Sequence, residues 1–125
     1  MRILIDTNIV LWAMSGSAKL SKRARHEIEQ ADAVYVSAAS LWEIGIKVWL
    51  GKLDVDIDEL SALLTEAGFE PLPVSWKHAR AIHALPHHHR DPFDRMLVAQ
   101  AISEPLRLVT HDAQLAKYSD VVVVV

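Results

Sequence analysis

The sequence predicts an α/β protein in which a central parallel β-sheet is flanked by helices on both faces. Short runs rich in Ile, Leu and Val alternate along the chain with segments of helical periodicity, and this alternation is typical of a covered parallel sheet. We expect one domain over residues 1–125, because no linker rich in Gly, Pro or Ser and no internal repeat divides the chain. A chain of 125 residues is also long enough to bury a core.

Five segments are expected to form strands. Residues 2–6 and 34–37 are short, apolar and stopped by polar side chains. Residues 69–74 contain two prolines, which suits an edge strand or an extended connection. The remaining strands are predicted at 106–110 and 121–125.

Helical segments fill the intervals, and several begin at a recognisable cap. Ser21 can cap a charged amphipathic segment, and Asp56 with Glu59 forms a capping signature. Asp91 followed by Pro92 marks a helix start, because proline is favoured at the first helical position. The predicted helices are 7–14, 22–30, 38–50, 56–67, 76–85, 92–103 and 113–118.

Composition excludes several classes of function. The chain has no cysteine, which rules out disulfides, thiolate zinc sites and cysteine nucleophiles, and its four glycines form neither a P-loop nor a dinucleotide fingerprint. The first apolar stretch is interrupted by Asp6 and Asn8, so we do not expect a signal peptide. No uncharged run approaches the roughly 18 residues of a membrane span. We expect a soluble, cytoplasmic protein, and the net charge of −3 is neutral evidence about a polyanionic partner.

Four carboxylates lie where this fold would gather them. Asp6 and Asp112 each close a predicted strand, and Glu43 and Asp94 lie near the starts of predicted helices. Residues at the carboxyl ends of parallel strands line the crevice where such folds bind ligands. Unpaired anions are costly to bury together, so the pattern predicts a divalent metal and a hydrolase of phosphate esters.

Each acid could also have a purely structural role, such as capping a helix or forming an ion pair, in place of binding a metal. Asp6 and Asp112 can serve only as helix N-caps, although capping and metal ligation are compatible. Glu43 can form a capping box with Ser40 or an i, i+4 pair with Lys47. We favour the ligand role because the acids occur together and because Glu43 is a lone acid in an apolar helix.

Neighbouring polar residues are assigned supporting roles. Asp91 is sufficiently explained as an N-cap, whereas Asp94 shares a helical face with small and apolar residues and should point into the crevice. Asn8 and Thr110 can hydrogen-bond a ligating carboxylate or a metal-bound water. We therefore take Asp6, Glu43, Asp94 and Asp112 as catalytic and metal-binding, with Asn8, Thr110 and Asp91 in support.

Other patterns are weaker. The run His87–His89 is interpreted as a solvated loop, because consecutive residues converge poorly on one ion. Residues 54–59 resemble a calcium loop but lack its glycine and bidentate glutamate. Trp12, Trp42 and Trp49 lie in helical patterns and are expected in the core; exposed ones would suggest a protein interface.

Four motifs occur in a characteristic order: Asp6-Thr-Asn after the first strand, Ala39-Ser-Leu-Trp-Glu43, Asp91-Pro-Phe-Asp94-Arg, and Val109-Thr-His-Asp112. In this respect the chain resembles the PIN-domain ribonucleases, and among them the VapC-type toxins of prokaryotic toxin–antitoxin modules. The match covers nearly the whole chain, and Asp-Pro-Phe-Asp-Arg is its most specific part. One departure matters little: His111 stands just before the last acid, at a position where the family is variable.

The resemblance implies a Mg²⁺- or Mn²⁺-dependent endoribonuclease that forms homodimers, cuts RNA and is inhibited by a cognate antitoxin. Carboxylate ligands independently suit these hard cations. The cationic side chains nearest the acids are the candidates for RNA contact. These are Arg90, Arg95 and Lys47. The alternatives are a non-catalytic protein-binding module on the same fold and a structure-specific DNA nuclease, although the latter lacks room for a DNA clamp.

Overall fold

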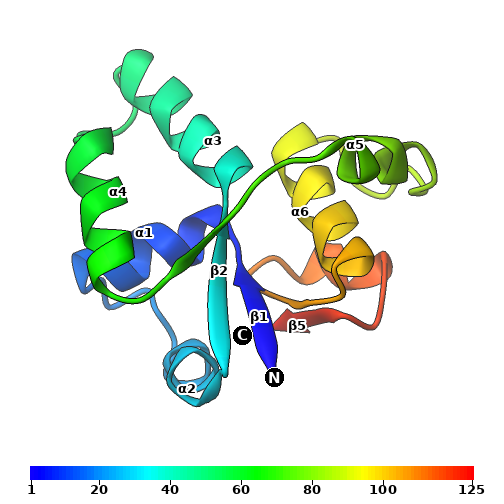
Figure 1. The fold of residues 1–125 in the computed structure, drawn as a ribbon, viewed down its shortest axis with the longest axis horizontal. Helices are drawn as coiled ribbons and strands as arrows, with labels where there is room; N and C mark the ends of the chain where they lie inside the picture. Colours follow the sequence, from blue (N-terminus) through cyan, green and yellow to red (C-terminus); the bar gives the residue numbers. More distant parts are fainter.

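A computed structural model describes residues 1–125 and shows a five-stranded sheet with helices on both sides (Figure 1). All four strand pairings are parallel, and the strand order is β3-β2-β1-β4-β5. This architecture confirms the predicted fold class. The strands are β1 (Arg2–Ile5), β2 (Ala33–Ser37), β3 (Glu70–Leu72), β4 (Arg107–Thr110) and β5 (Val122–Val124).

The helices also occur where the sequence predicts them, and every boundary agrees within about two residues, which is the usual uncertainty of helix ends. None of the helices is long and apolar enough to cross a membrane. The helices are α1 (Thr7–Ser15), α2 (Lys22–Gln30), α3 (Ala38–Trp49), α4 (Ile57–Glu66), α5 (Trp76–His83), α6 (Pro92–Ser103) and the short 3₁₀ helix η1 (Ala113–Lys117).

The proline-containing strand β3 lies at one edge of the sheet, as predicted. Its only partner is β2, with Pro71 in register with Val36. Proline cannot donate to a strand ladder, and an edge strand has one side on which no donor is needed. The edge position therefore follows from the sequence.

Helix α3 begins directly after β2, and its start excludes one alternative explanation. Ser37 is the N-cap, and its hydroxyl accepts a hydrogen bond from the Ala39 amide at 3.0 Å. Ser40 and Glu43 both lie inside the helix, which excludes the capping box that was the alternative explanation of Glu43. Their side chains are free to make tertiary contacts.

The core has two layers, one on each face of the sheet. Alternate residues of a strand point to opposite faces, and here Ile3 and Ile5 pack with the residues of α1 and α4, whereas Leu4 and Leu108 pack against α6. Figure 1 shows α1, α2, α3 and α4 on one side of the sheet and α5 and α6 on the other. Both faces are buried, which explains why the strands are apolar runs without polar alternation.

The strand order creates a switch point between β1 and β4. From β1 the chain proceeds outward to β2 and β3, and then returns to the other side of β1 to form β4 and β5. Neighbouring strands whose connections leave in opposite directions open a crevice at their carboxyl ends. This crevice lies next to Asp6, the residue that follows β1.

Candidate metal centre at the switch point

Asp6 is buried and both of its carboxylate oxygens are engaged. Oδ1 accepts the Ile9 amide at 2.9 Å and so caps α1, while Oδ2 accepts the Thr110 hydroxyl at 2.5 Å. Burial raises the pKa of Asp6, hydrogen bonds from Thr110 and Ile9 partly offset this, and the nearby Glu43 raises it further. Asp6 is therefore both the N-cap of α1 and a candidate metal ligand.

Thr110 joins two of the acids. Its hydroxyl donates to Asp6 Oδ2 and accepts the Asp112 amide at 3.0 Å. Thr110 ends β4 beside β1 and is fully buried. The hydroxyl therefore fixes the spacing between the segments that leave these two strands.

Glu43 approaches the crevice from α3 and is buried. Its Oε1 accepts the Thr7 hydroxyl at 2.7 Å, and that hydroxyl also lies 3.0 Å from the hydroxyl of Ser40. Its Oε2 lies 3.1 Å from Lys47 Nζ. The predicted i, i+4 pair is thus present, but it occupies only one oxygen. Sequence reasoning missed Thr7 and Ser40, whose hydroxyls carry no distinguishing local signal.

Asp91 and Asp94 have the separate positions that the sequence suggests. Asp91 Oδ1 accepts the amides of Phe93 at 2.8 Å and Asp94 at 3.1 Å, so Asp91 is the N-cap of α6. The Asp94 carboxylate accepts no hydrogen bond from the protein and remains partly accessible. Of the four acids, Asp94 therefore has the negative charge that the protein's own hydrogen bonds stabilise least.

The pKa of Asp94 is raised to about 7. Burial is the largest cause, followed by repulsion from Asp91; Asp6 and Glu43 add smaller repulsions, and His89 opposes them. Repulsion from residues so distant in sequence indicates that the fold brings these carboxylates near one another. A bound cation would remove this repulsion.

Asp112 caps the short helix η1 and faces a histidine. Its Oδ1 accepts the Gln114 amide at 2.9 Å, and its Oδ2 lies 3.2 Å from His89 Nε2. The same nitrogen lies 3.7 Å from Asp94 Oδ2. One ligand atom each from His89, Asp94 and Asp112 fall within 4.8 Å of one another.

The prediction for the histidine run is therefore wrong at one position. His87 and His88 are exposed, but His89 is half-buried and faces the acids. The turn that precedes the Asp91 cap directs this side chain inward. Periodicity gives no information about side-chain direction in such a loop, so the sequence offered no signal.

The cationic residues differ in their availability. Lys47 is held by Glu43. Arg95 donates to the Pro86 carbonyl at 2.8 Å, the Ile82 carbonyl at 3.3 Å and the Tyr118 hydroxyl at 3.1 Å. Its guanidinium thus ties the loop before α6 to the protein, which argues against the predicted contact with RNA. Arg90 is exposed and makes no ion pair. Asn8 is exposed and donates to none of the four acids.

The donor set fits a hard divalent cation. Carboxylate oxygens from four separate segments face one crevice, the pKa values of two of them are raised, and the Asp94 carboxylate lacks a protein donor. Mg²⁺ and Mn²⁺ prefer such oxygen ligands. The ligand atoms that lie within 4.8 Å of one another belong to His89, Asp94 and Asp112, and Asp6 and Glu43 lie close enough to Asp94 to raise its pKa.

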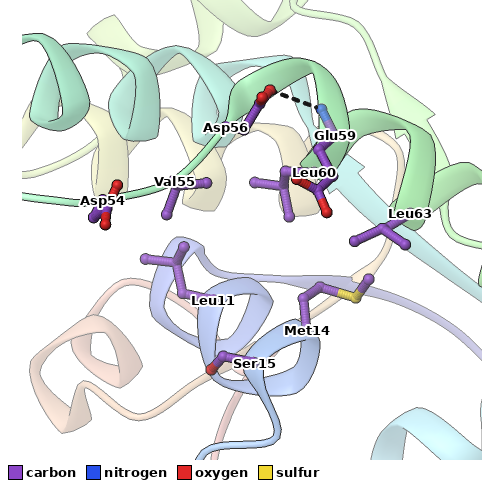
Figure 2. A pocket seen from close by; sticks show the side chains of 9 residues that line it. All are labelled: Leu11, Met14, Ser15, Asp54, Val55, Asp56, Glu59, Leu60 and Leu63. Atoms are coloured by element: carbon purple, nitrogen blue, oxygen red, sulfur yellow. Dashed lines mark hydrogen bonds between the residues drawn. The ribbon is translucent and has the colours of Figure 1, made fainter.

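The two largest hollows lie outside the acid crevice. The larger, about 440 Å³, is almost entirely apolar and lies among α3, α5 and α6. Trp42 and Phe93, whose ring centroids are 5.2 Å apart, form part of its wall. The smaller, about 190 Å³, lies between α1 and α4 (Figure 2), where Leu11 and Met14 face Leu63 beneath an acidic rim that includes Asp56.

The tryptophans contradict the prediction of a core position. Trp42, Trp49 and Trp76 are 66%, 84% and 85% exposed. Only Trp12 is half-buried, with its ring 5.4 Å from that of His111. Helix α3 is apolar nearly all round, but only one of its faces meets the sheet, which leaves Trp42 and Trp49 on its outer side.

The fold and this acid crevice define a class of protein. The family model for the PIN domain matches residues 3–121, and the chain belongs to this family. Among curated proteins, it is 30% identical over 118 residues to "Ribonuclease VapC22" of Mycobacterium tuberculosis, covering 93% of this chain and 91% of that one.

Solved structures show the same fold. VapBC2 from Rickettsia felis, bound to a DNA fragment from its promoter, has a TM-score of 0.71 at 17% identity and covers 100% of this chain and 98% of that one. FitAcB from Neisseria gonorrhoeae has a TM-score of 0.70 at 20% identity, with 100% and 97% covered. A toxin–antitoxin complex from Klebsiella pneumoniae has a TM-score of 0.68 at 20% identity, with 97% and 95% covered.

Proposed function

We propose that this protein is a Mg²⁺- or Mn²⁺-dependent endoribonuclease that hydrolyses RNA phosphodiester bonds and acts as the toxin of a toxin–antitoxin module. The observation that carries the proposal is the position of Asp94 at the switch point, where burial and repulsion from Asp91, Asp6 and Glu43 raise its pKa to about 7, and where Asp112 joins it through His89. Membership of the PIN family and similarity to a protein named a ribonuclease support the reaction class.

Each acid has a distinct part in this reaction. Asp6 and Asp94 hold the cation, and Thr110 and the α1 amide keep Asp6 from rotating. A divalent cation in such a site stabilises charge on the phosphate and makes a water nucleophilic near neutral pH. Glu43, held at one oxygen by Thr7, orients the attacking water or binds the ion. Asp112 takes part directly or through water, and Asp91 supports the site as the N-cap of α6.

RNA binding draws on cationic side chains at the rim. Arg90 is exposed next to the Asp91 cap, so it can reach a phosphate without breaking an internal contact. Lys47 can do so only by leaving Glu43 Oε2. Phosphate contacts position a nucleic acid but carry no sequence information, so they do not identify the RNA that is cut.

The partners are a cognate antitoxin and a second copy of the chain. The solved structures with this fold include one described as a toxin–antitoxin complex. The apolar hollow at Trp42 and the three exposed tryptophans favour a protein interface, since aromatic residues are enriched there. We place this activity in the prokaryotic cytoplasm, where RNA and antitoxin are both present.

The test is cleavage of a mixed RNA pool with and without Mg²⁺ or Mn²⁺. Asp6→Asn keeps the N-cap, because Asn caps a helix as well as Asp does; it removes the charge and replaces the oxygen that accepts the Thr110 hydroxyl with an amide NH2. We expect Asp6→Asn and Asp94→Asn each to lower the cleavage rate by roughly 100-fold or more. Even the loss of a residue that only hydrogen-bonds a metal ligand typically lowers metal affinity or activity by about 10–100-fold.

Asp56→Asn is the matched control. Asp56 is also an acidic N-cap, accepting the Glu59 amide at 3.0 Å, but it lies at the rim of the other hollow (Figure 2). This variant should cut RNA at the wild-type rate. Metal-independent cleavage, or equal cleavage by all the variants, would contradict the assignment of the site.

A further inference from the structure

We infer that His89 is a positioning residue that holds the carboxylates of Asp112 and Asp94 in place for cation binding, and that it is not itself a ligand. The inference rests on the proposed metal-dependent function. Its basis is the hydrogen-bonding of the two ring nitrogens, which face different groups.

The side of the ring that bears Nδ1 is fixed by the backbone. Nδ1 accepts the Asp91 amide N–H at 3.1 Å. A neutral imidazole has one donor and one acceptor nitrogen, so Nε2 carries the hydrogen. Nε2 lies 3.2 Å from Asp112 Oδ2 and 3.7 Å from Asp94 Oδ2. The tautomer that the backbone selects is the one that donates to Asp112 and turns its N–H toward the side on which Asp94 lies.

The two carboxylates need such a donor. Asp112 is 39% exposed and leads into a short 3₁₀ helix, and its other oxygen is fixed only by the Gln114 amide. The Asp94 carboxylate accepts no hydrogen bond from the protein. His89 Nε2 lies near both, and its contact with Asp112 joins the loop before α6 to the N-cap of η1 across a separation of 23 residues.

The loop that carries His89 is itself fixed. Arg95 donates to the Pro86 carbonyl and to the Tyr118 hydroxyl, and that hydroxyl donates to the His89 carbonyl at 3.4 Å. The His88 ring packs edge-on against Tyr118, with centroids 5.1 Å apart. The backbone of residue 89 is therefore held from both ends, as an aligning side chain requires.

Direct ligation would require a different arrangement. A metal-ligating histidine binds through one nitrogen and normally donates its other N–H to a carboxylate or carbonyl. At His89 the nitrogen away from the acids faces an N–H donor instead. Binding a cation through Nε2 would move the hydrogen to Nδ1, opposite the Asp91 N–H, and break that contact.

Calorimetric titration of the full chain with Mn²⁺ tests the inference. Glutamine carries an amide N–H at about the reach of Nε2, whereas asparagine carries one only at about the reach of Nδ1. We expect His89→Asn to weaken Mn²⁺ binding by roughly 10–100-fold and His89→Gln to stay within about threefold of wild type. The control, His87→Asn, changes an exposed histidine of the same loop and should have no effect.

Electron spin-echo spectroscopy of the Mn²⁺-loaded protein provides a readout that does not depend on activity. We expect no ¹⁴N coupling from a bound imidazole; such a coupling, lost in His89→Asn, would overturn the positioning role in favour of ligation. Equal affinities for His89→Gln and His89→Asn would overturn it in favour of mere packing. A wild-type chain that binds no Mn²⁺ would instead refute the metal site, and the inference with it.

Discussion

At the scale of single residues, the acids of the crevice serve the fold and the site together. Asp6, Asp91 and Asp112 are all N-caps. In a parallel α/β fold the carboxyl end of a strand lies near the start of the next helix, so one side chain can cap a helix and face the crevice. In Asp6, Oδ1 accepts the Ile9 amide and Oδ2 accepts the Thr110 hydroxyl. Asp-to-Asn substitutions separate the two roles, whereas substitutions to Ala confound them.

Asp94 should make the metal-free protein less stable as the pH rises. Its folded pKa, about 7, is above its ordinary value of 3.8, so the unfolded chain releases the proton first. The stabilising contribution is present below about pH 4 and is lost progressively up to about pH 7. Urea unfolding in the presence of a chelator at pH 5 and pH 8 should show a larger loss of stability for wild type than for Asp94→Asn.

The same unfolding measurements, repeated with Mn²⁺ in place of the chelator, test whether Asp94 binds the cation. The cation competes with the proton for Asp94, so it should raise the unfolding midpoint more at pH 8 than at pH 5. If wild type and Asp94→Asn respond identically to pH and to Mn²⁺, the carboxylate is neither buried against its neighbours nor a ligand.

At the scale of secondary-structure elements, helix α3 shows where a local pattern is insufficient. Its sequence is apolar nearly all round, a feature of buried helices, yet Trp42 and Trp49 are exposed. The inner face presents Ile44 to the core and Glu43 to the crevice. Apart from the edge contact of Trp42 with Phe93, the outer face is apolar and exposed, which is consistent with association between subunits.

The proposed homodimer should depend on this outer face. Trp42→Glu introduces a charge into the apolar hollow among α3, α5 and α6, so we expect the chain to sediment as a monomer. Because an exposed side chain contributes little to folding, unfolding stability should change by about 0.5 kcal/mol or less.

Leu63→Glu is the matched control for this experiment. Leu63 is also exposed, but it lines the hollow between α1 and α4 (Figure 2). This variant should remain dimeric in analytical ultracentrifugation. A monomeric wild type, or dissociation by Leu63→Glu alone, would exclude the α3 face as the interface.

At the scale of the whole molecule, strand order brings the site together. Asp6, Glu43, Asp94 and Asp112 come from four segments, and they meet because β4 returns to pair with β1 after the chain has formed β2 and β3. The crevice is therefore a property of the fold. We therefore expect a single Asp-to-Asn substitution in the crevice to remove its chemistry while the architecture is retained.

Induced expression of the chain in bacteria should arrest growth, and co-expression of its antitoxin should relieve the arrest. Cleavage of cellular RNA is the expected cause, so Asp94→Asn should abolish the arrest at equal protein levels while Asp56→Asn retains it. Growth curves with parallel mapping of RNA ends provide the measurement. Arrest that persists in Asp94→Asn would mean that the acid crevice is not responsible.

The sequence by itself determined the elements, their caps and the family. Apolar runs and capping residues such as Asp91-Pro92 are local signals, and residues 2–6 and 92–103 are recognisable from them. The positions of the four acids at strand ends and helix starts were equally readable, because the alternation of strands and helices fixes where the crevice must open.

Only the tertiary structure decided which side chains meet there. The contacts of His89 with Asp112, of Thr7 with Glu43 and of Arg95 with Tyr118 join residues 23 to 36 positions apart. Such contacts depend on strand order and loop path, which hydrophobic periodicity does not encode. For the same reason the exposure of Trp42 was not predictable, because periodicity cannot tell which apolar face of a helix meets the sheet and which is left for another chain.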